Sequence, residues 1–211
     1  MVKLLLIIVY RQNGADKPPT RLASASDLSS FSFWQRSTIG EHLRFATRTV
    51  CQRTAPGSRQ IVGLKDVPFL VHCYVKTDGL SGMVVTDSEY PQRVAFSLIN
   101  KILLDFEKTD DKWKTVTEDQ VVCGAERVQT TEPENMKADL VKFQDPSAAD
   151  KLTKIQKDLD EIKEVMHKNI DEVLKRGESL DTLMEKSEDL SNTSLQFYKK
   201  AKKTNQCCKM Y

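Results

Sequence analysis

The sequence lacks any long hydrophobic run. Its N-terminal apolar stretch, Leu4–Val9, is too short for the core of a signal peptide, and Arg11 soon follows with no small-residue cleavage site. No stretch approaches the roughly 20 apolar residues that a membrane-spanning helix needs. These absences argue against a secretory leader and against a spanning helix, and a buried strand is the better interpretation of residues 4–9.

The sequence also lacks an excess of charge and a pattern of paired cysteines. Its 32 basic and 30 acidic residues leave a net charge of +2, which argues against a general nucleic-acid binder. The five cysteines show no CxxC spacing, so neither a zinc site nor a disulfide framework is predicted. We expect Cys51, Cys73 and Cys123 to be reduced thiols of a cytosolic protein.

No group of residues resembles a catalytic site. The three histidines, His42, His72 and His167, lie far apart in the sequence, and "DGLSG" lacks the length and the lysine of a phosphate-binding loop. The sequence therefore predicts no enzyme, no catalytic or metal-binding residue and no bound cofactor.

The first part of the chain, residues 1–140, mixes strand and helix signals. Strands are expected in "KLLLIIVY" and "TRLASASDL", and an antiparallel hairpin is expected around "KTDGLSG". Helical spacing appears in "STIGEHLRFATRTVCQRT" and again after Pro91, which suits a first helical turn. This order predicts a small α+β domain in which helices flank an antiparallel sheet.

Phe45 stands apart from its own predicted helix stripe. At 100° per residue it lies about 200° round from Leu43, whereas Ile39, Ala46 and Val50 share the stripe with Leu43. Two interpretations are open: Phe45 is an aromatic at the rim of the core, or it is an exposed apolar contact for another element.

The second part of the chain carries a heptad repeat. Alternating steps of three and four from residue 152 give sixteen positions, here called the seam: Leu152, Ile155, Leu159, Ile162, Met166, Asn169, Val173, Arg176, Leu180, Leu183, Ser187, Leu190, Ser194, Phe197, Ala201 and Thr204. Eleven of the sixteen are apolar, which is typical of a heptad repeat. We expect one helix about 80 Å long, at 1.5 Å per residue. Because a lone helix cannot bury such a seam, it must bind partner helices or fold back onto the first part.

Arg176 is the charged exception in the middle of the seam. One interpretation is a surface arginine misplaced by a slip in register. However, Val173 and Leu180 hold the same phase on either side, which favours a guanidinium inside the seam. Such a group must be met by several acceptors, and a polar layer of this kind fixes register and partner choice.

These motifs together resemble one family. "IDEVLKRGESLDTLMEKSEDL" resembles the SNARE motif of the arginine-bearing class (R-SNAREs), and "DLSSFSFWQRS" and "DGLSGMVVTDSEYPQRVAFSLINKIL" resemble a longin domain of profilin-like fold. The resemblance implies that Arg176 forms the ionic central layer of a parallel four-helix bundle. There it would meet three glutamines from three glutamine-class SNARE helices, and zippering would fuse intracellular vesicles with their targets.

The resemblance to longin-domain R-SNAREs also implies a lipid anchor. Cys208 stands at the position that is prenylated in a C-a-a-X box, and Cys207 is the natural second site, for palmitate. Lys209 and Tyr211 depart from the usual box, so the isoprenoid stays open, and two incidental cysteines are the alternative. With the lysine-rich tail, these lipids would hold the chain at the cytoplasmic face of endomembranes, including the Golgi, ER-derived vesicles and the endosome or vacuole.

The expected organisation is a longin domain (1–140), a linker (141–150), a SNARE coiled-coil motif (151–205) and a lipidated tail (206–211). We further hypothesise a closed cytosolic state in which the helix wraps the longin domain and shields seam and isoprenoid. Its contact residues would be Phe45 and a second face of the helix: Val165, Ile170, Leu174, Met184 and Leu195. The alternative function is a longin-type trafficking adaptor or GTPase-regulating scaffold with another coiled coil, in which Arg176 would have no reason to be buried.

Overall fold

The structure is a computed structural model that describes residues 4–14, 16–65, 67–109, 112–119, 134–146 and 165–207, with side chains described as far as residue 202. Its strands form one sheet in the order β2-β1-β5-β4-β3-β6. The elements are β1 (Leu4–Arg11), β2 (Thr20–Ser26), α1 (Phe33–Arg53), β3 (Arg59–Gly63), β4 (Phe69–Val75), β5 (Leu80–Asp87), α2 (Gln92–Thr109), the 3-10 helix η1 (Trp113–Thr115), α3 (Glu134–Lys142), β6 (Val165–Asn169), α5 (Ile170–Val173), α6 (Leu180–Glu185) and α7 (Asn192–Cys207).

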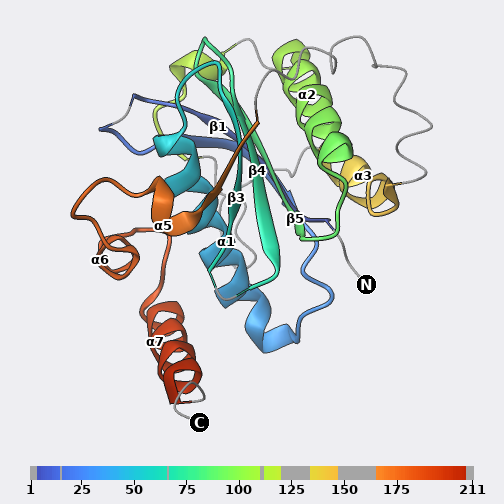
Figure 1. The fold of residues 1–211 in the computed structure, drawn as a ribbon. Helices are drawn as coiled ribbons and strands as arrows, with labels where there is room; N and C mark the ends of the chain where they lie inside the picture. Colours follow the sequence, from blue (N-terminus) through green and yellow to red (C-terminus); the bar gives the residue numbers. More distant parts are fainter. Residues whose placement is uncertain are drawn as a thin grey trace.

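Helices cover both faces of the sheet, with α1 on one face and α2 and α3 on the other (Figure 1). The continuous apolar run of β1 follows from this arrangement, because both faces of the strand are buried. Ile7 and Val9 pack with α2, and Ile8 and Tyr10 pack on the side of α1. The predicted α+β domain is therefore confirmed, as are the hairpin of β4 and β5 and the helix that begins directly after Pro91.

The packed body continues past residue 140. Met136, Leu140 and Phe143 are buried against the sheet, and the Gln144 amide exchanges two hydrogen bonds with the backbone of Leu4. No helix was predicted for residues 134–142. The helix α3 buries only two apolar side chains, Met136 and Leu140, and they form a recognisable face only against the sheet.

The expectation of one continuous helix over residues 152–204 is wrong in this structure for residues 165–191. Val165–Asn169 form a strand that pairs parallel to β3, so the sheet is mixed and not purely antiparallel. Gly177, with φ of 88°, follows α5 in a left-handed conformation that no helix contains. The helix is interrupted because apolar residues of this part are buried on the domain formed by residues 4–146, here called the longin domain after the resemblance given above, and a straight helix could not follow that surface. The seam positions before residue 165 lie outside the described residues.

In the part of the chain that the structure describes, no helix has the length and apolarity to cross a membrane.

Candidate functional site

The candidate site is the surface formed by α1 and the free edge of β3, onto which residues 165–202, here called the C-terminal segment, fold. The contact begins with β6, which adds a strand to the sheet in the register Arg59 opposite Val165 to Gly63 opposite Asn169. An edge strand presents unpaired backbone groups that invite another strand. The C-terminal segment therefore satisfies the edge that the longin domain would otherwise leave open.

Directly after β6 the segment enters the core. Asn169 begins α5 with a capping box in which its side chain and that of Glu172 bond the backbone reciprocally. Ile170 and Val173, on the inner face of this single turn, are buried with Leu43 and Val50 of α1. The cap thus fixes a short turn whose two apolar residues complete the core beside α1.

Phe45 is the centre of a second apolar contact. It is only 7% exposed, and it forms a cluster with Met184 of α6 and Leu190. Partly buried side chains complete the cluster: Leu180, Leu183, Leu195 and Tyr198. Of the two interpretations of Phe45, the structure supports a contact for another element, and that element is the C-terminal segment.

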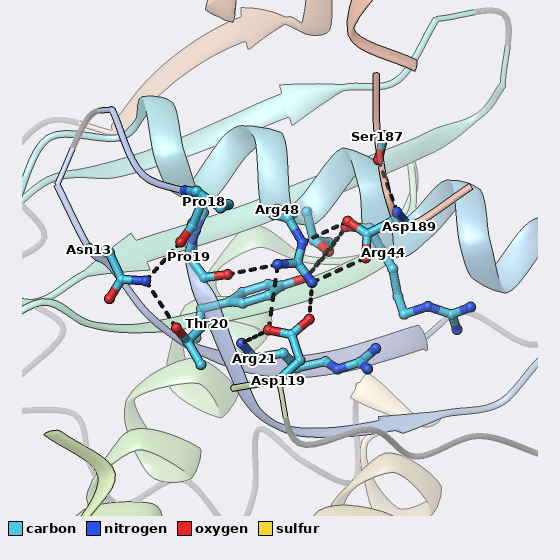
Figure 2. A network of polar contacts seen from close by, with 12 residues as sticks. Asn13, Pro18, Pro19, Thr20, Arg21, Arg44, Arg48, Asp119, Ser187 and Asp189 are labelled. Carbon is cyan, nitrogen blue, oxygen red and sulfur yellow. Dashed lines mark hydrogen bonds and ion pairs between the residues drawn. The ribbon is translucent and has the colours of Figure 1, made fainter. Parts of the chain in front are cut away.

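Arg48 of α1 links the longin domain to the segment through a polar network (Figure 2). Its guanidinium donates a hydrogen bond of 2.9 Å to the carbonyl of Pro19 and pairs with the carboxylate of Asp119, both in the longin domain. It also pairs at 2.6 Å with the carboxylate of Asp189 from the segment. Burial opposes the charge, but the two carboxylates outweigh it and raise the pKa of Arg48 above its ordinary value.

Two further polar contacts fasten the segment along α1. Glu41 accepts hydrogen bonds from the Ser191 backbone amide, at 2.8 Å, and from the Ser194 hydroxyl, at 2.6 Å. Burial raises the pKa of Glu41, but these hydrogen bonds outweigh burial and hold it below its ordinary value. Arg53 donates two hydrogen bonds, of 2.9 and 3.0 Å, to the carboxylate of Glu178.

The segment and the longin domain together line an apolar cavity of about 340 Å³ that is partly open to solvent. This volume lies at the lower end of the range of about 300–1,000 Å³ that is typical of small-molecule sites. Phe31, Phe45 and Phe69 line it from the longin domain, and Met184 and Phe197 line it from the segment. A cavity with this lining suits an apolar guest, and it exists only while the two parts are together.

The seam residues have three environments in this structure. Val173, Leu190 and Ser194 are buried, and Leu180, Leu183 and Ser187 are half-buried. Exposed positions are Met166, Asn169, Arg176, Phe197 and Ala201, whereas the side chain of Thr204 and all of Leu152, Ile155, Leu159 and Ile162 lie outside the description. Of the expected second face, Ile170 and Met184 are buried, and Val165, Leu174 and Leu195 are half-buried. Arg176 is thus on the surface, in the turn before Gly177.

Sequence reasoning missed the polar contacts of Glu41, Arg48 and Arg53. Glu41 and Arg48 lie four residues before and three residues after Phe45, so all three share one helix face. A charged face with one aromatic is typical of a solvated surface, and nothing local distinguishes it from a docking surface. The two free cysteines that the structure describes, Cys51 and Cys73, are both buried, and burial raises the pKa of Cys73 to about 12.

Comparison with family models divides the chain in the same way. The Longin model, described as a regulated-SNARE-like domain, matches residues 28–124. The Synaptobrevin model matches residues 151–211. The two matches therefore fall on the sheet domain and on the part of the chain that contains the C-terminal segment.

Curated relatives match over nearly the whole length. "Synaptobrevin homolog ykt6" of Schizosaccharomyces pombe is 48% identical over 194 residues, which cover 91% of this chain and 92% of the relative. "VAMP-like protein YKT61" of Arabidopsis thaliana is 43% identical, and "Synaptobrevin homolog YKT6" of Saccharomyces cerevisiae is 39% identical, each match covering 98% of both chains.

Proposed function

Because the chain belongs to the longin-bearing synaptobrevin family of trafficking SNAREs, which are not enzymes, we propose that it zippers into a parallel four-helix bundle with three glutamine-class SNARE helices. Arg176 supplies the ionic central layer of this bundle. The longin domain holds the segment closed until partners and a membrane are available. The family match favours this function over an adaptor or a GTPase-regulating scaffold.

One observation carries the proposal of a closed state: residues of the seam itself are buried on the longin domain. Val173 and Leu190 are 7% exposed each, and both are core positions of the heptad repeat. The same side chains cannot pack on α1 and on partner helices at once. Closure and zippering therefore exclude one another, whereas exposed Arg176 takes no part in closure.

The amount of apolar surface that each arrangement buries decides between the closed state and the bundle. Four apolar side chains of the segment are fully buried in the closed state, namely Ile170, Val173, Met184 and Leu190. At about 1.5–3 kcal/mol each, their burial outweighs leaving the segment in water. A heptad bundle would bury eleven apolar seam positions, so matched partner helices displace the longin domain.

Lipids on Cys207 and Cys208 complete the proposal. A single chain, at about 0.8 kcal/mol per buried methylene, anchors a protein only marginally, and two give stable attachment. We propose palmitate on Cys207 and an isoprenoid on Cys208. In the closed state the isoprenoid occupies the cavity between Phe45 and Phe197, whose lining includes Ala201 and Lys202 of α7, and it leaves the cavity when the segment opens.

The decisive experiment mixes the full chain with three glutamine-class SNARE helices and follows a thermally resistant 1:1:1:1 complex. Phe45→Glu places a carboxylate in the cluster with Met184 and Leu190, so it should speed assembly and move the lipidated chain onto membranes. Leu104→Glu is the matched control, because Leu104 is 46% exposed on α2, on the other face of the sheet. If Phe45→Glu forms no complex at all, the SNARE function fails and an adaptor is favoured.

Two further measurements test the parts separately. Small-angle scattering of the full chain should report a compact particle, and an extended particle in which the segment samples free solvent would contradict closure. Intact-mass measurement of the chain from its own cytosol and membranes identifies the attached lipids. Arg176→Gln should alter the selection of partner helices, and unchanged selection would remove the ionic layer from the proposal.

A further inference from the structure

Two adjacent aromatic residues at the start of α1 project into solvent. Phe33 is 73% exposed and Trp34 is 87% exposed, and their rings meet edge to face with centroids 5.5 Å apart. Phe31, two residues earlier, instead packs against Phe69 at the edge of the core. Phe33 and Trp34 contact each other but belong to none of the apolar clusters of the described residues. We call this protruding pair the aromatic tip.

The aromatic tip lies at the end of the molecule where the C-terminal segment finishes. Phe31 lines the same cavity as Ala201 and Lys202 of α7. In Figure 1 the start of α1 and the helix α7 both lie at the lower end, on the side marked C. The start of α1 and the last described side chains of α7 therefore lie at the same end of the molecule.

The helix α7 contains four lysines and no acidic residue, so it contributes only positive charge to this end. The first turn of α1 contains no acidic residue, and Arg36 is exposed one turn after the tip. On α7, Lys199 and Lys200 are exposed and Lys202 is half-buried beside the cavity. Lys199 pairs with Glu185 and Lys202 pairs with Asp181, both of α6. Basic residues near an anionic leaflet attract it, and tryptophan favours the headgroup boundary because its ring is apolar while its N–H group needs a polar partner.

We propose that the aromatic tip is a second membrane-contact site, which inserts Phe33 and Trp34 into the headgroup boundary of a bilayer beside the C-terminal anchor. A protein partner is less favoured, because the pair stands on a protruding helix end and neither ring lines the apolar cavity described above. The contact holds the longin domain against the bilayer beside the C-terminal anchor. This inference rests on one part of the proposed function, namely that the chain works at a membrane.

The test uses the full chain with Cys207→Ser and Cys208→Ser, so that no lipid anchor contributes, and no partner SNARE, so that zippering plays no part. The chain has two tryptophans, and Trp113 is only 5% exposed, so Trp34 reports the surface. With vesicles of phosphatidylcholine and phosphatidylserine, its emission should shift to the blue, and brominated lipids should quench it. Trp113→Phe, checked for folding by circular dichroism, assigns the signal to Trp34.

Co-sedimentation with the same vesicles then compares matched variants. Phe33→Ala with Trp34→Ala should weaken binding by on the order of tenfold, as expected for two partly inserted aromatic side chains. Leu104→Ala with Val141→Ala is the control, because it removes two exposed apolar side chains from α2 and α3, and it should leave binding unchanged. Equal loss in both double variants, or an unshifted Trp34 emission, overturns the proposal even if the four-helix bundle forms.

Discussion

The longin domain and the C-terminal segment are stabilised in opposite ways. In the longin domain, α1 has 21 residues and α2 has 18, and both pack on strands that are buried on two faces. In the segment, α5 has four residues and α6 has six. Helices this short are unstable alone, so their structure depends on the surface beneath them. The longin domain determines its own fold, whereas the segment takes the fold that its partner surface selects.

A second difference concerns how the apolar residues are used. In the longin domain, Phe96 packs only within the domain, for example against His72 with ring centroids 5.7 Å apart. In the segment, the seam residues Val173 and Leu190 and the off-seam residues Ile170 and Met184 are all buried against the longin domain. The seam residues are thus shared between closure and the bundle that we propose.

The largest expected effect breaks both regions at once. Phe96→Ala removes a fully buried ring from α2 and should lower the free energy of unfolding by about 3–5 kcal/mol. Because the segment has no surface to pack on once the longin domain unfolds, both regions should unfold together in urea. Circular dichroism would follow this unfolding. Met184→Ala is the counterpart and should expose only the segment to hydrogen exchange. Global unfolding of Met184→Ala at the same urea concentration as Phe96→Ala would contradict the comparison.

A smaller effect separates the two carboxylates that share Arg48. Asp189→Asn removes the charge from the segment and should weaken closure by about 1–3 kcal/mol, seen as faster hydrogen exchange in β6 and α6. Asp119→Asn removes the partner inside the longin domain and should instead lower the stability of that domain. Glu188→Gln, an exposed neighbour with the same change of charge, is the control and should resemble the unaltered chain.

A pair of glycines sharpens the comparison further. Gly177 and Gly14 both have φ of 88°, and a Cβ on either would meet nothing within 4 Å. Alanine in this left-handed conformation costs about 1–2 kcal/mol. In Gly177→Ala, alanine also stabilises the continuous helix of the open state by about 1 kcal/mol relative to glycine. Both effects favour opening, so assembly with partner helices should accelerate. Gly14→Ala should destabilise the longin domain without accelerating assembly, and equal assembly rates for the two variants would sink this prediction.

The smallest effect is a dependence of closure on pH. Burial lowers the pKa of His42 below its ordinary value of 6.5, although the negative charge of Glu41 acts to raise it. The ring of His42 faces Tyr198 of α7, so it is the C-terminal segment that covers it. Because the closed state favours neutral His42, closure is fully stable above about pH 6.5 and weakens as the pH falls towards the lowered pKa. Hydrogen exchange in the segment should therefore rise from about pH 7.5 to about pH 5.5 after correction for the intrinsic rate. In His42→Gln this dependence should flatten.

Local patterns predicted most of the longin domain. The run of β1, the hairpin of β4 and β5 and the apolar stripe of α2 each carry their signal within a few residues. The helix α3 and the strand β6 were missed, because Met136 and Val165 gain their partners only through the sheet. The contact made by Phe45 was one of two interpretations of its position off the stripe, but its neighbours on the same face of α1, Arg48 and Glu41, had no signal of their own.

The sequence by itself determined the buried strands, the seam and the cation within it, because hydrophobic periodicity and charge are properties of neighbouring residues. Tertiary structure alone decided that residues 165–191 are not one helix. The reason is the surface of the longin domain. Where α1 and the edge of β3 are available, burying Ile170, Val173 and Met184 on them is more favourable than forming a helix whose seam lies in water.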